Sequence, residues 1–278
     1  MLKRIVLVDL NPLMIEAWKK EFEGDDRVEV VHGSIIDSGA DVWVSPTNGK
    51  GRLSGGVDAV IKATLGAAVE TALQKTIAAS PHNGTLRIGR AVFVRNPKKG
   101  GAKGVVFTPT MVGESDNVSR TQNTALAGAA AFQAINMLGD GGVIDAESVA
   151  LPGLGAGTGR VPVGTCAKLT RVYVKLFERG RFDSFDEMLD ALNEELEGVG
   201  LAKAKLDRAA LRKDGLYTEA DEAEGDAVKA SKDAQAETVD DLGPLPTTSA
   251  PSTWDPASEA KAKLPEDVVA ESWLQAPA

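Results

Sequence analysis

Apolar residues follow two different patterns along the first 180 residues. Short apolar runs rich in β-branched residues predict buried strands, at 3–10, 27–32, 40–44, 89–94, 104–109 and 148–152. Between them, apolar residues recur every three or four positions, which predicts helices at 13–22, 57–65, 67–79, 123–138 and 163–179. This alternation of strands and helices is typical of an α/β fold.

The pattern changes after Phe182. An amphipathic helix is expected over 185–196 and a less regular one over 201–216. Further on, Ala, Glu, Asp, Ser, Thr and Pro dominate, and such a composition buries too little apolar surface to offset the loss of chain entropy. We therefore expect a folded domain over 1–182, a helical extension over 183–216 and a mostly disordered tail over 217–278.

Charge separates the two parts of the chain. Residues 1–182 carry 22 basic and 17 acidic residues, whereas residues 183–278 carry 9 and 23, which together give the net charge of −9. The tail is either a solvated acidic segment or a segment that contacts a basic protein partner; Trp254 and Trp273 could anchor a short recognition motif there. Net acidity argues against nucleic-acid binding.

The remaining composition limits location and cofactors. The sequence contains no run of about 18 apolar residues, so we expect no membrane span. The first residues resemble a strand rather than a signal peptide, so we expect a cytoplasmic protein that does not contact membranes. The single Cys166 excludes an internal disulfide and is interpreted as a small buried residue. With only two histidines in the chain, we expect no metal and no cofactor.

A glycine-rich turn links the strand ending near Val44 to the helix beginning near Val57. Asn48 follows the strand, and Gly55 and Gly56 precede the helix. Unpaired backbone N–H groups and the helix dipole favour an anion at such a turn, so a phosphate or pyrophosphate ligand is one hypothesis, with Asn48 and Asp58 facing it. The alternatives are a turn that only needs glycine for its backbone and an Asp58 that only stabilises the helix dipole.

Asp9 and Asn11 follow the first strand. An acidic residue at a strand end occurs in nucleotide-binding folds, but no G-x-G-x-x-G precedes this one. We expect both residues to cap the following helix or shape its turn.

Two motifs resemble those of one family. Val-Ser-Pro-Thr-Asn (44–48), followed by Gly-Gly-Val-Asp (55–58), resembles the signature of the macro domain, an ADP-ribose-binding, Appr-1-p processing-like α/β module. The glycine-rich segment from Pro152 to Pro162 resembles the family's second ligand loop. The resemblance covers about residues 1–180 and implies a three-layer α/β/α fold with a mixed central sheet.

The resemblance also implies roles for individual residues. Ser34 and Ile35 would contact adenine, Asn48 would orient the distal ribose and act in catalysis, and Asp58 would be the catalytic base. The diphosphate would be held by backbone groups of Gly55, Gly56, Val57, Gly155, Ala156, Gly157 and Thr158. Ser34 replaces the family's aspartate and Gly159 replaces an aromatic residue that stacks on the ribose, so we expect weaker or altered recognition.

The sequence is compatible with three functions. The resemblance implies binding of ADP-ribose or an ADP-ribosylated substrate and hydrolysis of the adduct. The first alternative is a non-catalytic ADP-ribose-binding module. The second is a structural or assembly protein that keeps the fold, because the Ser-Pro-Thr-Asn form also resembles divergent bacterial and phage macro-like proteins.

Overall fold

The computed structural model describes residues 2–79, 84–204 and 268–271. The first part of the chain contains β1 (Arg4–Asp9), α1 (Pro12–Glu21), β2 (Val28–His32), the 3-10 helix η1 (Ile35–Asp37), β3 (Val42–Ser45), α2 (Gly56–Leu65) and α3 (Ala67–Ala78). The second part contains β4 (Val92–Arg95), β5 (Gly104–Phe107), α4 (Asn123–Asp140), β6 (Ser148–Leu151), α5 (Val163–Arg179), α6 (Phe185–Gly198) and β7 (Val268–Glu271). The predicted helices up to α5 agree with these to within two residues at each end.

The strands form one mixed sheet in the order β2-β1-β6-β3-β5-β4-β7. Strands β2, β1, β6, β3 and β5 run parallel to one another, whereas β4 runs antiparallel to both of its neighbours, β5 and β7. Because parallel strands end at the same edge, the loops after β1, β6, β3 and β5 meet on one side of the molecule.

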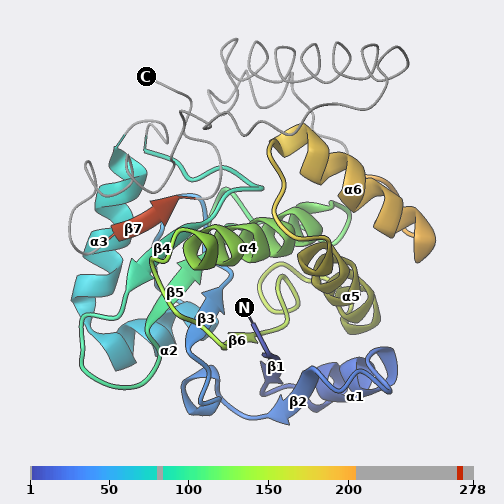
Figure 1. Cartoon of the computed structure of the whole chain (residues 1–278), viewed down its shortest axis with the longest axis horizontal. Helices are drawn as coiled ribbons and strands as arrows, with labels where there is room; N and C mark the ends of the chain where they lie inside the picture. Colours follow the sequence, from blue (N-terminus) through green and yellow to red (C-terminus); the bar gives the residue numbers. More distant parts are fainter. Residues whose placement is uncertain (1, 80–83, 205–267, 272–278) are drawn as a thin grey trace, which may run out of the picture.

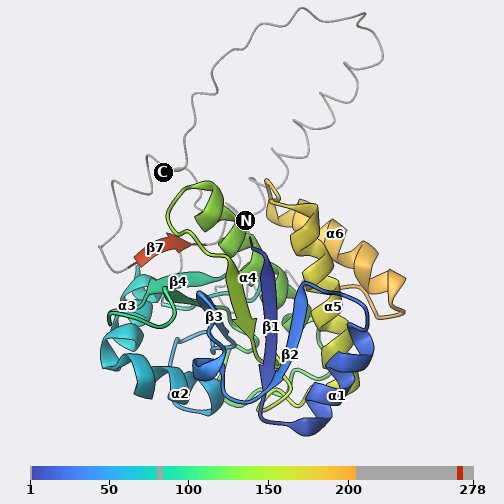
Figure 2. The same cartoon turned by 60° about the horizontal axis from the view of Figure 1, so that its bottom comes forward.

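Helices cover both faces of the sheet (Figures 1 and 2). Successive strand side chains point to opposite faces: Ile5 and Leu7 join the core cluster that also contains residues of α1, α4, α5 and α6. Val6 and Val8 join the second cluster, which contains residues of η1, α2 and α3. The expected three-layer α/β/α fold is therefore confirmed.

The helical layer that consists of α1, α4, α5 and α6 is tightly packed around α5. A Cβ atom on Gly128 of α4 would lie 2.1 Å from Cδ1 of Tyr173 of α5, so only glycine allows these helices to approach so closely. On the other side of α5, Trp18 Nε1 donates to Thr170 Oγ1 at 3.0 Å. Cys166 is completely buried in this layer, as its interpretation as a small core residue requires.

Helix α6 packs on this layer through Met188, Leu192 and Leu196, which are buried in the first core cluster. Ser184 caps it by accepting a hydrogen bond from the Glu187 N–H at 3.2 Å. Residues 201–204 are not helical, and the rest of the helix predicted over 201–216 lies outside the described residues.

Strand β7 lies within the tail that we expected to be mostly disordered. It pairs antiparallel with β4 and forms the edge of the sheet, which no pattern in the sequence indicated. The other tail residues, Trp254 and Trp273 included, lie outside the described residues. Within the described ranges, none of the helices combines the length and the apolar character needed to cross a membrane.

Candidate functional site

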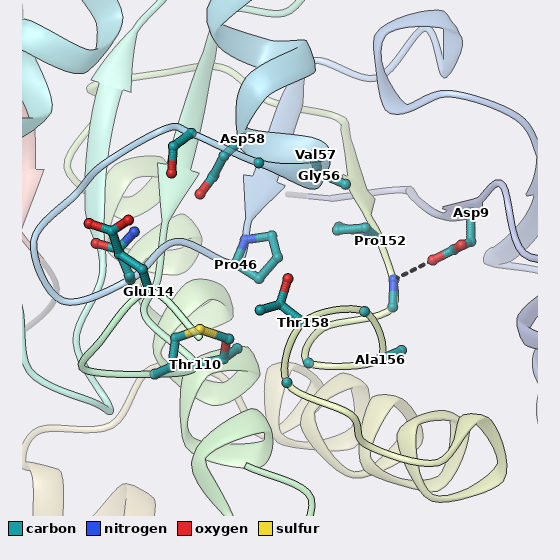
Figure 3. A pocket seen from close by; sticks show the side chains of 18 of the residues that line it. Asp9, Pro46, Gly56, Val57, Asp58, Thr110, Glu114, Pro152, Ala156 and Thr158 are labelled. Carbon is teal, nitrogen blue, oxygen red and sulfur yellow. Dashed lines mark hydrogen bonds between the residues drawn. The ribbon is translucent and has the colours of Figure 1, made fainter. Parts of the chain in front are cut away.

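A cavity of about 290 Å³ lies at the carboxyl ends of the parallel strands (Figure 3). Its wall is built from the loops that follow β1, β3, β5 and β6, together with the first turn of α2. In an α/β sheet, this edge is where ligands generally bind. The cavity therefore defines the candidate site.

The loop after β3 contributes the start of α2. Gly55 is the N-cap residue, and Gly56 has a φ of +54° in the left-handed region that favours glycine. A Cβ atom at either position would meet nothing within 4 Å. The first N–H groups of a helix have no partner within the helix, so this turn presents positive backbone dipoles to the cavity.

The loop after β6 forms the facing wall. A Cβ atom on Gly155 would lie 2.4 Å from Thr124 Oγ1, and one on Gly159 would lie 2.7 Å from the Gly155 oxygen. The loop is closed by the Val161 N–H, which donates to the Gly155 oxygen at 3.0 Å. Both glycine-rich loops identified in the sequence thus line the same cavity.

Asp9 and Asn11 also line the cavity. Asn11 caps α1 by accepting from the Leu13 N–H at 3.0 Å, which confirms its expected capping role. Asp9 accepts from the Asn11 N–H at 2.9 Å and, beyond the expectation, from the Gly153 N–H at 3.1 Å. Asp9 therefore holds the second glycine loop against the end of β1.

Asn48 lines the cavity, but its side chain is largely engaged by its own turn. Its Oδ1 accepts from the N–H groups of Lys50 at 3.0 Å and Arg52 at 3.3 Å. Its Nδ2 donates to the Arg52 oxygen at 2.9 Å. One amide hydrogen is left over, since the group carries two. Asn48 thus shapes the 48–52 turn and has limited capacity for a ligand.

Asp58 is a buried carboxylate in the first turn of α2, with 7% of its surface exposed. The Ser45 hydroxyl at the end of β3 donates to its Oδ1. Burial raises the pKa of Asp58 to about 6, the hydrogen bond from Ser45 opposes this rise, and the negative charge of Glu70 adds to it. Such a group changes its protonation close to neutral pH, which suits a general base.

Ser34 and Ile35 are not among the residues that line the cavity. Ile35 is 4% exposed and packs in the second core cluster, while Ser34 precedes η1 at its N-terminus. Both follow the edge strand β2, and β1 lies between β2 and the strands that carry the glycine loops. The cavity therefore brings together the other predicted site residues without these two.

The loop after β5 supplies residues that the sequence did not reveal. Thr110, Met111 and Glu114 line the cavity from this loop. Thr110 is completely buried, and its hydroxyl has no hydrogen-bond partner among the described residues. Glu114 forms an ion pair with Arg52, from Oε1 to Nη1, at 2.7 Å. These residues stand far from the glycine motifs in sequence, so only strand order could have identified them.

Within the part of the chain that the structure describes, no group of histidine, cysteine or acidic residues is arranged to hold a metal ion. The polar groups that line the cavity are main-chain N–H groups, three carboxylates, hydroxyls, Asn11, Asn48 and Arg52. Such a surface suits a phosphorylated ligand held mainly by backbone N–H groups.

The family model described as Macro domain matches residues 44–170, which include both glycine-rich loops. The chain belongs to the macro domain family. An uncharacterised protein of Aquifex aeolicus is 33% identical over 154 residues, which make up 54% of this chain and 82% of that protein.

Two solved macrodomains are similar to this chain at low sequence identity. The macrodomain of Mycobacterium tuberculosis DarG is 20% identical, with a TM-score of 0.42, over 53% of this chain and 87% of that one. A mutant Oceanobacillus iheyensis macrodomain solved with ADPR is 18% identical, with a TM-score of 0.44, over 60% of this chain and 90% of that one.

Proposed function

We propose that this macro domain binds ADP-ribose, or a derivative of it, in the cavity at the carboxyl ends of the sheet. The observation that carries the proposal is the convergence of the two glycine-rich loops on one cavity. The family match supports it, because ADP-ribose binding is general to macro domains. The volume of about 290 Å³ is just below the usual range for small-molecule sites, about 300–1,000 Å³.

Backbone groups would hold the diphosphate. The N–H groups at the start of α2 and those of Gly155, Gly157 and Thr158 lie on facing walls, so a diphosphate between them would receive hydrogen bonds from both sides. The Ala156 N–H already donates to the Gly153 oxygen at 3.0 Å, so it would not contribute. The ribose beyond the diphosphate would lie towards Asn48, where one amide hydrogen remains for a hydroxyl group.

Hydrolysis of an ADP-ribosyl adduct is the reaction that the site supports best. A water oxygen would attack the anomeric carbon, or the carbon of an acyl ester, while Asp58 accepts the proton of that water. The bond to the leaving group breaks with its electron pair, and the proton passes to the leaving group. A pKa of about 6 leaves Asp58 mostly ionised at neutral pH and therefore able to accept this proton.

A binding module without catalysis is the second candidate. The Asn48 side chain is engaged by its own turn, and Asp58 is hydrogen-bonded by Ser45. At position 159 the packing admits only glycine, so the loop offers no aromatic ring to a ribose there. These contacts favour a site that binds ADP-ribose without the full set of catalytic contacts.

Calorimetric titration with ADP-ribose, combined with hydrolysis of an ADP-ribosylated protein, separates the two candidates. For a hydrolase, Asp58→Asn is expected to bind ADP-ribose with little change and to lose turnover, whereas Asp26→Asn, an exposed control before β2, keeps both. Binding without turnover in the wild type would favour the binding module. Absence of binding in the wild type would refute the proposal.

Two finer predictions are independent of this site. A protein partner for the acidic tail rests on the contrast between the charge of +5 over 1–182 and −14 over 183–278. The cytoplasmic location also stays a prediction, which fractionation of the source cells would test.

A further inference from the structure

An exposed ion pair joins two walls of the cavity. Arg52 belongs to the loop after β3 and Glu114 to the loop after β5, with 2.7 Å between Nη1 and Oε1. Their side chains are 62% and 47% exposed, and both residues line the cavity. In Figure 3, Glu114 lies on the opposite side of the cavity from Asp9.

The charges around the cavity make Arg52 distinctive. Asp9, Asp58 and Glu114 are the carboxylates among the lining residues, and Arg52 is the one cationic side chain in that set. Asp9 accepts from two backbone N–H groups, and Asp58 accepts from Ser45, so neither engages Arg52 in the contacts of the described residues. Among the described residues, a diphosphate that enters this cavity therefore meets three negative charges and a single positive side chain.

Arg52 is placed to reach such a ligand. It stands three residues before Gly55, in the loop whose backbone would hold the diphosphate, and three residues span at most about 10 Å. Its main-chain N–H and carbonyl are both hydrogen-bonded to the Asn48 side chain. The base of the side chain is thus fixed while its guanidinium group remains exposed.

The ion pair between Arg52 and Glu114 is exposed, so Arg52 can readily exchange Glu114 for another anion. Exposed pairs of this type contribute little to stability, whereas arginine binds phosphate through strong, often bidentate hydrogen bonds. We propose that Arg52 is a phosphate-binding residue of this site, and that Glu114 competes with the ligand's diphosphate for it and lowers the affinity. This inference rests on the proposed binding of ADP-ribose and names a contact within that site.

The test is calorimetric titration of ADP-ribose into full-length variants. Arg52→Ala is expected to weaken binding about tenfold or more, because a charge-assisted hydrogen bond is lost. Arg52→Lys should recover part of this loss, since it keeps the charge. Glu114→Gln is expected to tighten binding about two- to fivefold. Both effects should shrink at high salt, because exposed charges are screened.

A matched control pair exists elsewhere in the protein. Arg4 and Glu29 form an exposed ion pair at 3.2 Å, with side chains 42% and 50% exposed. Arg4 lies at the amino end of β1, whereas the cavity lies at the carboxyl ends of the strands. Arg4→Ala and Glu29→Gln are expected to leave affinity unchanged. If Glu114 acts through Arg52, then Glu114→Gln should tighten binding less in an Arg52→Ala background.

The outcomes separate this inference from the proposed function. Wild-type protein that binds ADP-ribose, together with Arg52 and Glu114 variants that bind equally well or shift in the same direction, would overturn the role of Arg52 and leave the function standing. Wild-type protein that does not bind ADP-ribose would overturn the function and this contact with it. Thermal unfolding of each variant checks that affinity changes do not come from loss of fold.

Discussion

Replacing Asp58 by asparagine tests both the electrostatics and the chemistry of the site. The pKa of Asp58 is raised from 3.8 to about 6, mainly by burial. The folded state therefore binds this proton more tightly than the unfolded state. The stabilisation by the proton is fully present below pH 3.8 and is lost as the pH rises through about 6.

The magnitude follows from the two pKa values. Their difference of about 2.2 corresponds to about 3 kcal/mol, since one pKa unit equals about 1.4 kcal/mol. Asparagine stays neutral at every pH, and its Oδ1 can still accept the hydrogen bond from Ser45. Asp58→Asn should therefore be more stable than the wild type at pH 8, by at most about 3 kcal/mol, with little gain at pH 4.

Urea unfolding at pH 4 and pH 8 measures this gain, and the exposed Asp26→Asn serves as the control substitution. A melting temperature would rise by about 2–4 °C per kcal/mol for a domain of this size. If Asp58→Asn were less stable than the wild type at pH 8, the buried charge of Asp58 would not destabilise the folded state, and the reasoning would be wrong. Hydrolysis measured on the same samples should be lost, in spite of the higher stability.

Three further predictions concern positions around this site and away from it. Gly157→Val should weaken ADP-ribose binding about tenfold or more in calorimetry, because a Cβ atom there meets nothing within 4 Å and the side chain would fill the cavity; Gly164→Val, on an exposed turn of α5, should bind normally. In urea unfolding, Thr110→Val should be neutral or slightly stabilising, since its buried hydroxyl has no partner among the described residues. Thr108→Val should cost about 1–3 kcal/mol, since the Thr108 hydroxyl contacts the Arg90 and Ala127 oxygens. Burial raises the pKa of Asp41, but hydrogen bonds from the Glu147 N–H and from Lys103 lower it by more. Asp41→Asn should therefore lose stability at pH 7, and this loss should disappear as the pH falls below the usual pKa of 3.8 and Asp41 becomes protonated. Urea unfolding at pH 7 and below pH 3.8 measures this change.

Local patterns in the sequence determined the elements of this fold and the two glycine-rich loops. Strands and helices up to α5 follow from the spacing of apolar residues, because each side chain's direction depends on its own backbone. Asn11 was recognisable as a cap and Gly55–Gly56 as the start of a helix, since both effects act within a few residues. The family resemblance rested on the same local segments, 44–58 and 152–162.

Only the tertiary structure decided which segments meet. The pairing of β5 with β3 brings Glu114 to Arg52 and Thr110 to the cavity wall, and the edge position of β2 keeps Ser34 out of that wall. The raised pKa of Asp58 depends on the burial that the complete fold imposes on it. Contacts of this kind join residues that are distant along the chain, and their geometry is set by strand order and layer packing, which no local pattern specifies.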